Sequence, residues 1–347
     1  MGQKLENKNK RTTLKDISNA TGFSITTVSL VLNNKPSRIS ETVKEKIFKT
    51  AKEMGYRPNQ TAIGLVKQRS KTIGLIVSNI SNTFYANLTK GIEKACKELG
   101  YNVILCNTDD NFEACEDSIQ ILADRGIDGI ILGMSTDMDE EKAHKSKALL
   151  ESNNIPFIFV DRFFFSMDSP TVITDNILGG FLATDYLIKM GHKKIVCITG
   201  PTQLSDARDR VIGYKRALKA NGIELDENYI IDGDYSMKSG IRAFHKIQEL
   251  DITGVFACSG LMAIGFYKAA RKNNYKIPSD YSLVSYDDYF YMDIMEVPFT
   301  TIKQPIFEMG KACAQKIVDL IKGVKDETNY TILPPQLIIR ESVKKIN

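Results

Sequence analysis

The sequence predicts two kinds of structure in one chain: a small all-α headpiece, followed by an α/β body of two doubly wound lobes. Apolar residues recur at helical spacing in the first 60 residues,. From Thr72 onward, apolar runs of strand length alternate with amphipathic helical segments, which is typical of parallel α/β sheets. The length of 347 residues, with 43% hydrophobic and 25% charged residues, suits two or three globular domains,.

Charge is divided unevenly between these two parts. The whole chain has a formal net charge of +4. Residues 1–71 contain 15 Lys and Arg against 5 Asp and Glu, a net charge of +10, whereas residues 72–347 contain 31 against 37, a net charge of −6. This asymmetry indicates that the headpiece binds a polyanion and that the body does not.

Several classes of protein are disfavoured by what the sequence lacks. No apolar run approaches the length of about 18 residues that a membrane span needs, and residues 1–11 are polar and basic, unlike a secretory signal,. We therefore expect a cytoplasmic protein. The six cysteines form no C-x-x-C motif, and the three histidines have no metal-binding spacing, so we expect no metal and no cofactor. Phosphate-binding loops and a nucleophile elbow are absent, so we expect no enzyme.

The headpiece is predicted to contain three helices, over residues 14–21, 25–33 and 40–54. Gly22 interrupts the helical pattern after the first two turns. Two short helices joined by a tight turn that contains glycine, with a third helix packed behind them, form a helix-turn-helix motif. The second helix of such a motif enters the DNA major groove. We therefore predict that residues 1–57 form a DNA-binding domain.

Motifs in the headpiece resemble those of the LacI/GalR family of bacterial transcription repressors. They are Thr13-Leu14-Lys15-Asp16-Ile17, then Thr27-Val28-Ser29 with Val31-Leu32-Asn33, and Met54-Gly55-Tyr56-Arg57-Pro58-Asn59. The resemblance implies that one set of side chains lies near DNA phosphates, where contacts orient the protein without reading the sequence. This set is Thr13, Ser24, Thr27, Ser29, Asn33, Tyr56 and Asn59.

The same resemblance leaves the reading of base edges to Ile25, Thr26 and Leu30. Most family members carry Arg where this chain has Leu30. An Arg that binds guanine through two hydrogen bonds contributes about 1–3 kcal/mol of discrimination. We therefore expect an operator that departs from the family's usual consensus.

Residues 58–71 join the two parts of the chain. Considered alone, this segment is too short for a stable helix, and Gly64 weakens it further,, so the residues themselves favour a flexible linker. The family resemblance instead implies a hinge helix that forms on operator DNA, paired with the same helix of a second subunit. It places Ala62 and Leu65 in the minor groove, with Leu65 as the wedge that opens a base step.

The body, residues 72–347, is predicted as the effector-binding and dimerisation domain. The resemblance to periplasmic sugar-binding proteins implies a first lobe of about residues 72–168 and 303–330. The second lobe then contains about residues 169–302 and 331–342. The expected strands are 73–78, 103–107, 129–132 and 157–160 in the first lobe, and 172–174, 195–199, 230–231, 254–258 and 283–285 in the second.

The effector site is expected at the carboxyl ends of these strands, where open α/β sheets bind ligands. Carboxylates, arginines and aromatic rings follow the strands, and this combination binds sugar hydroxyls and covers the apolar faces of the ring. Asp175-Asn176 and Gly191-His192 also resemble ribose repressors. The resemblance implies effector contacts at Asn82, Phe84, Tyr85, Asp161, Arg162, Arg208, Tyr235, Ser259, Asp287 and Gln304. The family usually has Asn-Asp where this chain has Ser259-Gly260.

Together these features predict a homodimeric transcriptional repressor whose operator affinity is controlled allosterically by ribose or a related pentose. Three alternatives stay open. A purine could act as corepressor, a phosphocarrier protein could do so, or the chain could be a sugar-binding transport component. The basic headpiece and the absence of a secretory signal disfavour the transport component,.

If Leu65 is a minor-groove wedge, Leu65→Ala will weaken binding to operator DNA far more than binding to unrelated DNA. The wedge acts only where a deformable base step is present, whereas phosphate contacts act on any duplex. Fluorescence anisotropy with operator and unrelated duplexes measures both affinities. Equal losses on the two duplexes would rule out the wedge.

Overall fold

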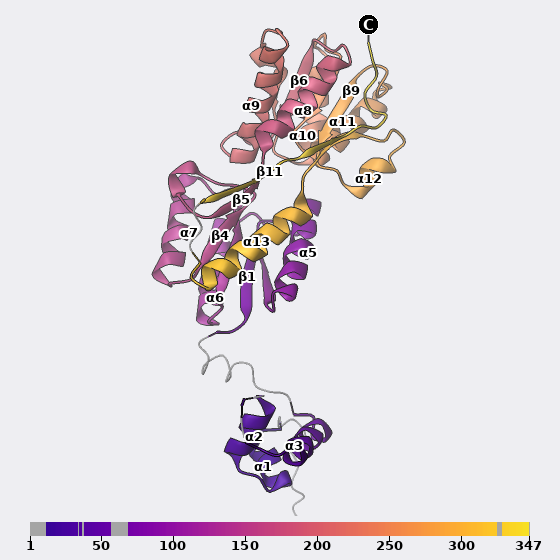
Figure 1. Cartoon of the computed structure of the whole chain (residues 1–347). Helices are drawn as coiled ribbons and strands as arrows, with labels where there is room; N and C mark the ends of the chain where they lie inside the picture. Colours follow the sequence, from indigo (N-terminus) through magenta and orange to yellow (C-terminus); the bar gives the residue numbers. More distant parts are fainter. Residues whose placement is uncertain (1–11, 34, 37, 57–68, 325–327, 347) are drawn as a thin grey trace, which may run out of the picture. The chain divides into compact units, whose positions relative to one another are not determined.

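The computed structural model describes residues 12–33, 35–36, 38–56, 69–324 and 328–346. The chain divides into two compact units, Met1–Ser70 and Lys71–Asn347, which are described separately below (Figure 1). No helix among the described residues is long and apolar enough to cross a membrane.

The headpiece consists of α1 (Leu14–Thr21), α2 (Ile25–Leu32) and α3 (Glu41–Glu53). Between α1 and α2, Gly22 adopts a left-handed conformation with φ of 78°, and its N–H closes α1 on the carbonyl of Ser18. Glycine adopts this conformation at no steric cost. The three helices enclose a small core of Ile17, Val28, Val31, Ile47 and Ala51. The predicted helix-turn-helix arrangement is therefore confirmed.

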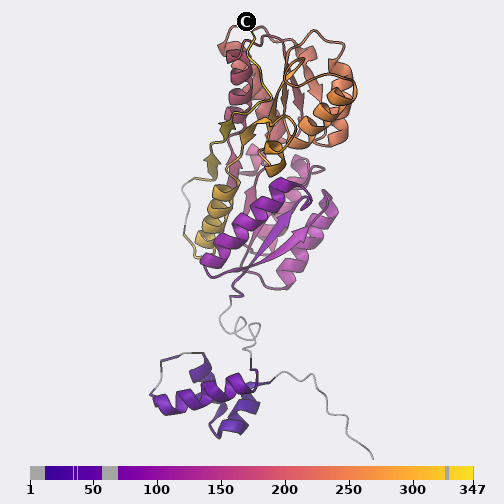
Figure 2. The same ribbon diagram turned by 90° about the vertical axis from the view of Figure 1, so that its right-hand side faces the viewer.

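The body contains two six-stranded sheets, one in each lobe (Figures 1 and 2). The first sheet has the order β11-β5-β4-β3-β1-β2 and is parallel throughout. Its strands are β1 (Thr72–Val77), β2 (Asn102–Asn107), β3 (Gly129–Gly133), β4 (Phe157–Val160), β5 (Thr171–Thr174) and β11 (Tyr330–Leu333). The central strands β1 and β3 are almost continuously apolar and buried, as strands covered on both faces must be.

The second sheet has the order β12-β10-β9-β8-β6-β7, and only the pair β10 and β12 is antiparallel. Its strands are β6 (Ile195–Thr199), β7 (Ile230–Asp232), β8 (Gly254–Ala257), β9 (Ser282–Tyr286), β10 (Thr300–Lys303) and β12 (Gln336–Ile338). Both sheets are doubly wound, as predicted.

Helices cover both faces of each sheet. In the first lobe, α5 packs with α13 and α6 packs with α7, and these two pairs belong to separate hydrophobic cores. In the second lobe, α8 pairs with α9 and α10 pairs with α11. The first-lobe helices are α5 (Thr83–Glu98), α6 (Phe112–Asp124), α7 (Glu140–Ser152) and α13 (Ile306–Ile321), with the 3-10 turn η1 (Phe165–Met167). The second-lobe helices are α8 (Asn176–Lys189), α9 (Ser205–Ala220), α10 (Met237–Ile247), α11 (Gly260–Lys272) and α12 (Phe290–Asp293), with η2 (Glu227–Tyr229).

The chain crosses between the lobes three times: after β5, after β10 and after β11. The expected boundaries at residues 168–169 and 330–331 were therefore each one strand too early, because β5 and β11 belong to the first sheet. A short apolar run has the same appearance in either sheet, and only pairing with β4 shows where β5 belongs.

The helices α8 and α9 approach each other so closely that only glycine fits at their contact. A Cβ atom on Gly180 would lie 2.1 Å from the carbonyl oxygen of Arg210, and one on Gly213 would lie 2.1 Å from that of Ile177. Two glycines therefore bring the backbones of α8 and α9 into contact. This packing places the N-terminal turns of both helices at the same end of the second sheet.

Candidate functional site

A polar cavity lies between the two lobes, beyond the carboxyl ends of both sheets. The free space in and around it is about 420 Å³, including solvent at its opening, and the centre of a water-sized sphere can reach about 40 Å³ of it. The lining residues are Asn82, Phe84, Tyr85, Asp161 and Arg162 from the first lobe, and Asp206, Arg210, Tyr235, Ser259, Leu261, Asp287, Tyr289 and Gln304 from the second lobe and its crossing segment. The structure thus brings together every residue expected at the effector site except Arg208.

Arg208 is the one expected residue that the cavity does not include. Its side chain is 40% exposed, and its Nε lies 3.4 Å from Asp209 Oδ1. Arg210 lines the cavity instead. Both residues belong to α9, where two positions of separation turn side chains about 200° apart. They therefore face opposite sides of the helix, and the structure places Arg210 rather than Arg208 at the cavity.

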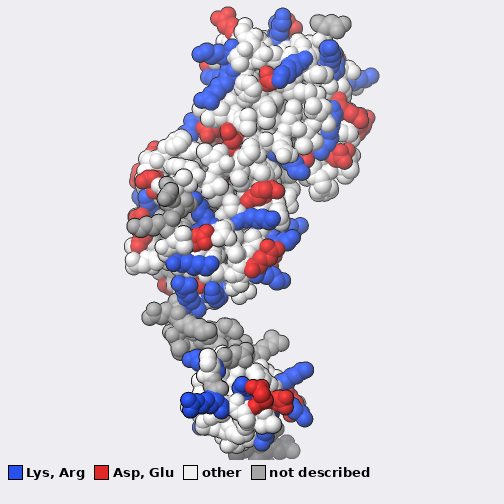
Figure 3. Space-filling model, in the orientation of Figure 1, with Lys and Arg blue, Asp and Glu red and all other residues white. Residues whose placement is uncertain are grey.

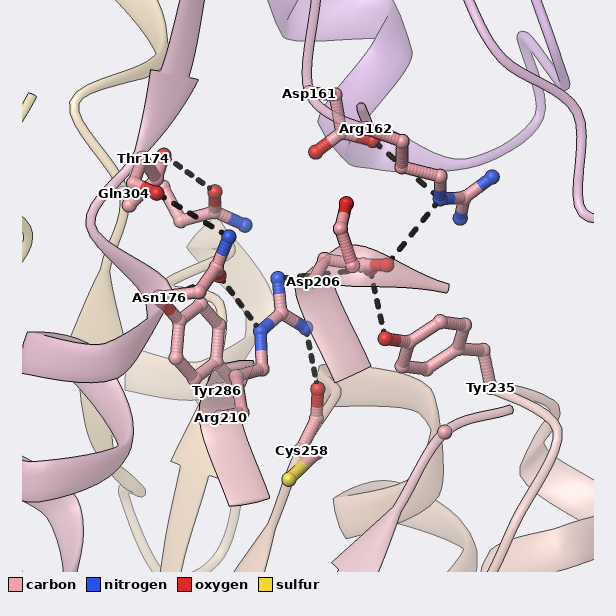
Figure 4. Close-up of polar contacts among 12 residues, drawn as sticks. Asp161, Arg162, Thr174, Asn176, Asp206, Arg210, Tyr235, Cys258, Tyr286 and Gln304 are labelled. Atoms are coloured by element: carbon pink, nitrogen blue, oxygen red, sulfur yellow. Dashed lines mark hydrogen bonds and ion pairs between the residues drawn. The ribbon is translucent and has the colours of Figure 1, made fainter. Parts of the chain in front are cut away.

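The guanidinium of Arg210 is fully enclosed and held from several sides (Figure 4). Its Nε donates to Asn176 Oδ1 at 2.9 Å, and an Nη atom donates to the carbonyl of Cys258 at 2.6 Å. The guanidinium carbon lies 3.7 Å from the ring centre of Tyr286, whose hydroxyl also donates to Asn176. These contacts fix one orientation of a charged donor beside the cavity.

Arg162 and Asp206 face each other across the cavity from different lobes (Figure 4). Arg162 Nε lies 3.5 Å from Asp206 Oδ1, and both atoms are buried without a hydrogen-bond partner among the described residues. The other oxygen of Asp206 accepts the hydroxyl of Tyr235 at 2.7 Å. The two atoms attract each other as an ion pair, but neither makes a hydrogen bond with good geometry,. A ligand that donates to Asp206 and accepts from Arg162 would supply those hydrogen bonds.

The two carboxylates nearest Arg162 differ in their protonation. Burial raises the pKa of Asp161 to about 6, although the Arg162 guanidinium opposes this effect. Tyr85 donates its hydroxyl to Asp161 at 2.8 Å. Burial would also raise the pKa of Asp206, but Arg162 and Arg210 outweigh it and hold that pKa below its ordinary value. Asp161 therefore changes protonation near pH 6, while Asp206 stays ionised.

Gln304 connects the cavity to the segments that cross between the lobes. Its amide nitrogen donates to Asp287 at 2.7 Å, and its amide oxygen accepts the hydroxyl of Thr174 at 2.9 Å (Figure 4). Thr174 ends β5 immediately before one crossing, and Gln304 follows β10 at another. A ligand that binds Asp287 therefore contacts a hydrogen-bonded chain that reaches both crossings.

Three residues of the cavity have left-handed backbone conformations that non-glycine residues rarely adopt. The φ angles are 76° at Asp161, 64° at Tyr235 and 71° at Asp287. Such conformations cost about 1–3 kcal/mol each and cluster at functional sites. For Tyr235, Gly200 supplies the space, since a Cβ there would lie 2.3 Å from the tyrosine ring.

Four cavity residues were not expected from the sequence: Asp206, Arg210, Leu261 and Tyr289. The Asp-Ala-Arg-Asp-Arg run at residues 206–210 carried a signal, because helical spacing puts its first and last residues on one face,. Leu261 and Tyr289 carried none, since an isolated apolar or aromatic residue after a strand is as frequent in the core as in a site.

In the headpiece, the exposed start of α2 carries two of the residues expected to read bases. Ile25 is 48% exposed and Thr26 is also exposed, whereas Ser29 and Leu30 are partly buried. Lys and Arg side chains are visible on this unit in Figure 3.

Several of the residues expected near phosphates lie at the ends of the headpiece helices. Thr13 and Ser24 cap the N-termini of α1 and α2, where free backbone N–H groups favour an anion,. The hydroxyls of Ser24 and Thr27 lie 2.8 Å apart, and the amide of Asn33 donates to the carbonyl of Ser29 at 2.8 Å.

Tyr56 packs against the headpiece core, and burial raises its pKa. Asn59, Ala62 and Leu65 lie outside the described residues.

Comparison with known families identifies both parts of the chain. Residues 13–59 match the family of bacterial regulatory proteins named after LacI. Residues 70–341 match the periplasmic binding proteins and sugar binding domain of the LacI family. The chain belongs to the LacI family.

Curated relatives in the LacI family match this chain over nearly its whole length. The repressor PurR of Vibrio campbellii is 32% identical over 337 residues, covering 96% of this chain and 99% of the relative. The ribose operon repressor of Escherichia coli K12 is 32% identical over 333 residues, covering 95% and 99%. These relatives are transcriptional repressors rather than enzymes.

Solved LacI family structures share the fold. The lac repressor dimer bound to operator and the anti-inducer ONPF matches with a TM-score of 0.87 and 26% identity, covering 96% of this chain and 100% of that one. A LacI family regulator from Enterococcus faecium with bound ribose matches with a TM-score of 0.70 and 29% identity, covering 80% and 100%. The helix-turn-helix headpiece and the two-lobed periplasmic-binding-protein-like body are therefore those of a LacI family DNA-binding transcription regulator.

Arg208 and Arg210 of α9 are expected to contribute very differently to stability. Arg210→Ala will lower the free energy of unfolding by about 3–5 kcal/mol, because it removes a buried cation from beside Asp206 and a hydrogen-bond donor from Asn176 and Cys258,. Arg208→Ala, the matched control on the exposed face, will change it by no more than about 0.5 kcal/mol. Urea denaturation followed by circular dichroism measures both, and similar effects of the two substitutions would contradict the assignment.

Proposed function

We propose that this LacI family member represses transcription from an operator and releases it when ribose or a related pentose binds between its lobes. The observation that carries this proposal is the interlobe cavity itself. It combines buried carboxylates, two buried guanidiniums and several aromatic rings, contributed by both lobes.

The lining suits a polyhydroxylated ring better than an apolar ligand. Asp161, Asp206 and Asp287 offer acceptors to hydroxyl groups, while Arg162 and Arg210 offer donors,. Phe84, Tyr235 and Tyr289 supply rings that can cover the apolar faces of a sugar,. The E. faecium regulator with bound ribose and the E. coli ribose operon repressor support a pentose among the possible sugars.

Control of DNA binding follows from the position of the ligand between the lobes. A sugar held by Arg162 of one lobe and Asp206 of the other favours one relative arrangement of the lobes,. That arrangement is transmitted to the segment with Leu65, whose helix then no longer forms on DNA. Thermodynamic linkage requires operator DNA to weaken sugar binding by the same factor.

We also propose that the functional unit is a homodimer. Phe290 of α12 and Ile294, the residue that follows this helix, are 77% and 74% exposed, which is high for large apolar side chains,. The lac repressor structure that matches this chain is a dimer bound to operator. A two-fold symmetric dimer would bind a pseudo-palindromic operator with its two headpieces.

The second candidate is a corepressor-dependent regulator that responds to a purine. The relative PurR, 32% identical over nearly the whole chain, supports it. A purine also presents adjacent donor and acceptor atoms that could bind Asp206 and Arg162. The two candidates differ in direction, since a corepressor tightens operator binding and an inducer weakens it.

Fluorescence anisotropy with DNA from the promoter region of its own gene will distinguish these candidates. We expect ribose to weaken operator binding by about 5- to 150-fold, the usual range of allosteric coupling. Tighter binding in the presence of hypoxanthine would support the purine corepressor instead. If neither compound changes the affinity, the proposed effectors are wrong.

Sugar affinity is expected to depend on pH through Asp161. Its side chain accepts a hydroxyl hydrogen bond more strongly when ionised than when protonated, and its pKa is about 6. Below pH 6 the affinity should therefore fall by up to about tenfold per pH unit, and above pH 7 it should be constant. Calorimetric titration with ribose between pH 5 and pH 8 measures this, and Asp161→Asn should remove the dependence. A flat profile in the unsubstituted protein would contradict the prediction.

A further inference from the structure

Tyr289 occupies one end of the interlobe cavity. It follows β9, precedes α12 as its N-terminal flanking residue, and is only 5% exposed. Its ring borders the cavity together with Asn82 and Leu261. The residue belongs to the second lobe, and yet its hydroxyl reaches the first.

The hydroxyl of Tyr289 donates to Asn82 Oδ1 at 3.4 Å. The same oxygen of Asn82 accepts the backbone N–H of Phe84 at 3.0 Å and so caps α5. The tyrosine therefore binds a side chain that is already fixed by the first turn of a helix in the opposite lobe. This contact closes the cavity on that side.

Gly260 provides the space for the tyrosine ring. A Cβ atom on Gly260 would lie 2.8 Å from Tyr289 Cε2 and 2.8 Å from the terminal carbon of Met292. The neighbouring Ser259 accepts the N–H of Met262 with its hydroxyl and so caps α11. Any larger side chain at position 260 would have to displace the ring.

A second contact between the lobes involves Arg162 and Asp206, whose side-chain atoms are 3.5 Å apart. Side chains of the two lobes therefore meet at the cavity through Tyr289 with Asn82 and through Arg162 with Asp206. Only about 40 Å³ of the cavity can be reached by the centre of a water-sized sphere, so side chains already fill most of the space between the lobes.

We propose that Tyr289 is a specificity-determining residue that closes the cavity and restricts the effector to a single sugar ring. This inference rests on the proposed sugar effector. A disaccharide would have to extend past Tyr289 and break its bond to Asn82. Gly260 contributes to the same restriction, because the absence of a side chain at position 260 lets the Tyr289 ring take this position.

Calorimetric titration of the full-length protein with D-ribose and with xylobiose, a disaccharide of two pentoses, tests the restriction. Calorimetry suits a chain without tryptophan. We expect the ratio of the xylobiose Kd to the ribose Kd to fall at least tenfold in Tyr289→Ala. An unchanged ratio would overturn the proposal.

Tyr289→Phe is the matched control, since it keeps the ring and removes only the hydroxyl. It should leave the ratio of the two Kd values within threefold of the unsubstituted protein, while ribose binding weakens several-fold. Gly260→Ala should change the ratio in the same direction as Tyr289→Ala, because its methyl group displaces the ring. A ratio in Tyr289→Phe as low as in Tyr289→Ala would overturn restriction by ring size.

A measurement without ligand separates this proposal from the proposed function. If the unsubstituted protein binds neither ribose nor xylobiose, the pentose effector is wrong. The closure of the cavity is then judged by amide hydrogen exchange in residues 83–86 of the ligand-free protein. Tyr289→Ala should speed this exchange at least threefold, because Asn82 loses its partner in the opposite lobe. Unchanged exchange would contradict the closure.

Discussion

The effector-binding body is organised around one buried charge, the guanidinium of Arg210. Removing such a group from water costs several kcal/mol, which only close and well-directed partners can offset. Those partners come from four elements: Asn176 at the start of α8, the carbonyl of Cys258 after β8, the Tyr286 ring of β9 and Asp206 on α9 itself. The elements that enclose one side of the cavity must therefore hold their positions for Arg210 to be accommodated.

The glycine contacts between α8 and α9 acquire their importance from this charge. Gly180 lies against the carbonyl of Arg210, so any side chain there would move the arginine's own backbone. The same close packing brings Asn176 within 2.9 Å of Arg210 Nε. The glycine contacts that pack α8 against α9 thus also position the Arg210 guanidinium beside the cavity.

Several cavity residues are held in the folded protein at a cost in free energy, which ligand binding would reduce. Arg162 Nε and Asp206 Oδ1 are buried without hydrogen bonds, and Asp161, Tyr235 and Asp287 have strained backbone angles. Natural proteins tolerate such costs at sites where function requires them. Because the Arg162–Asp206 ion pair joins different lobes, a ligand that hydrogen-bonds to both residues would also favour one interlobe arrangement.

The sequence alone determined the two-part organisation, the helix-turn-helix headpiece and most of the residues that line the cavity, since local spacing and motifs carry that information. Only the tertiary structure decided that β5 and β11 belong to the first sheet, because a short apolar run does not indicate which strands it will pair with. It likewise showed that Arg210 and not Arg208 lines the cavity, because the two side chains face opposite sides of α9. Tyr289 could not be found from the sequence, because its role depends on the space left by Gly260 and on Asn82 in the opposite lobe.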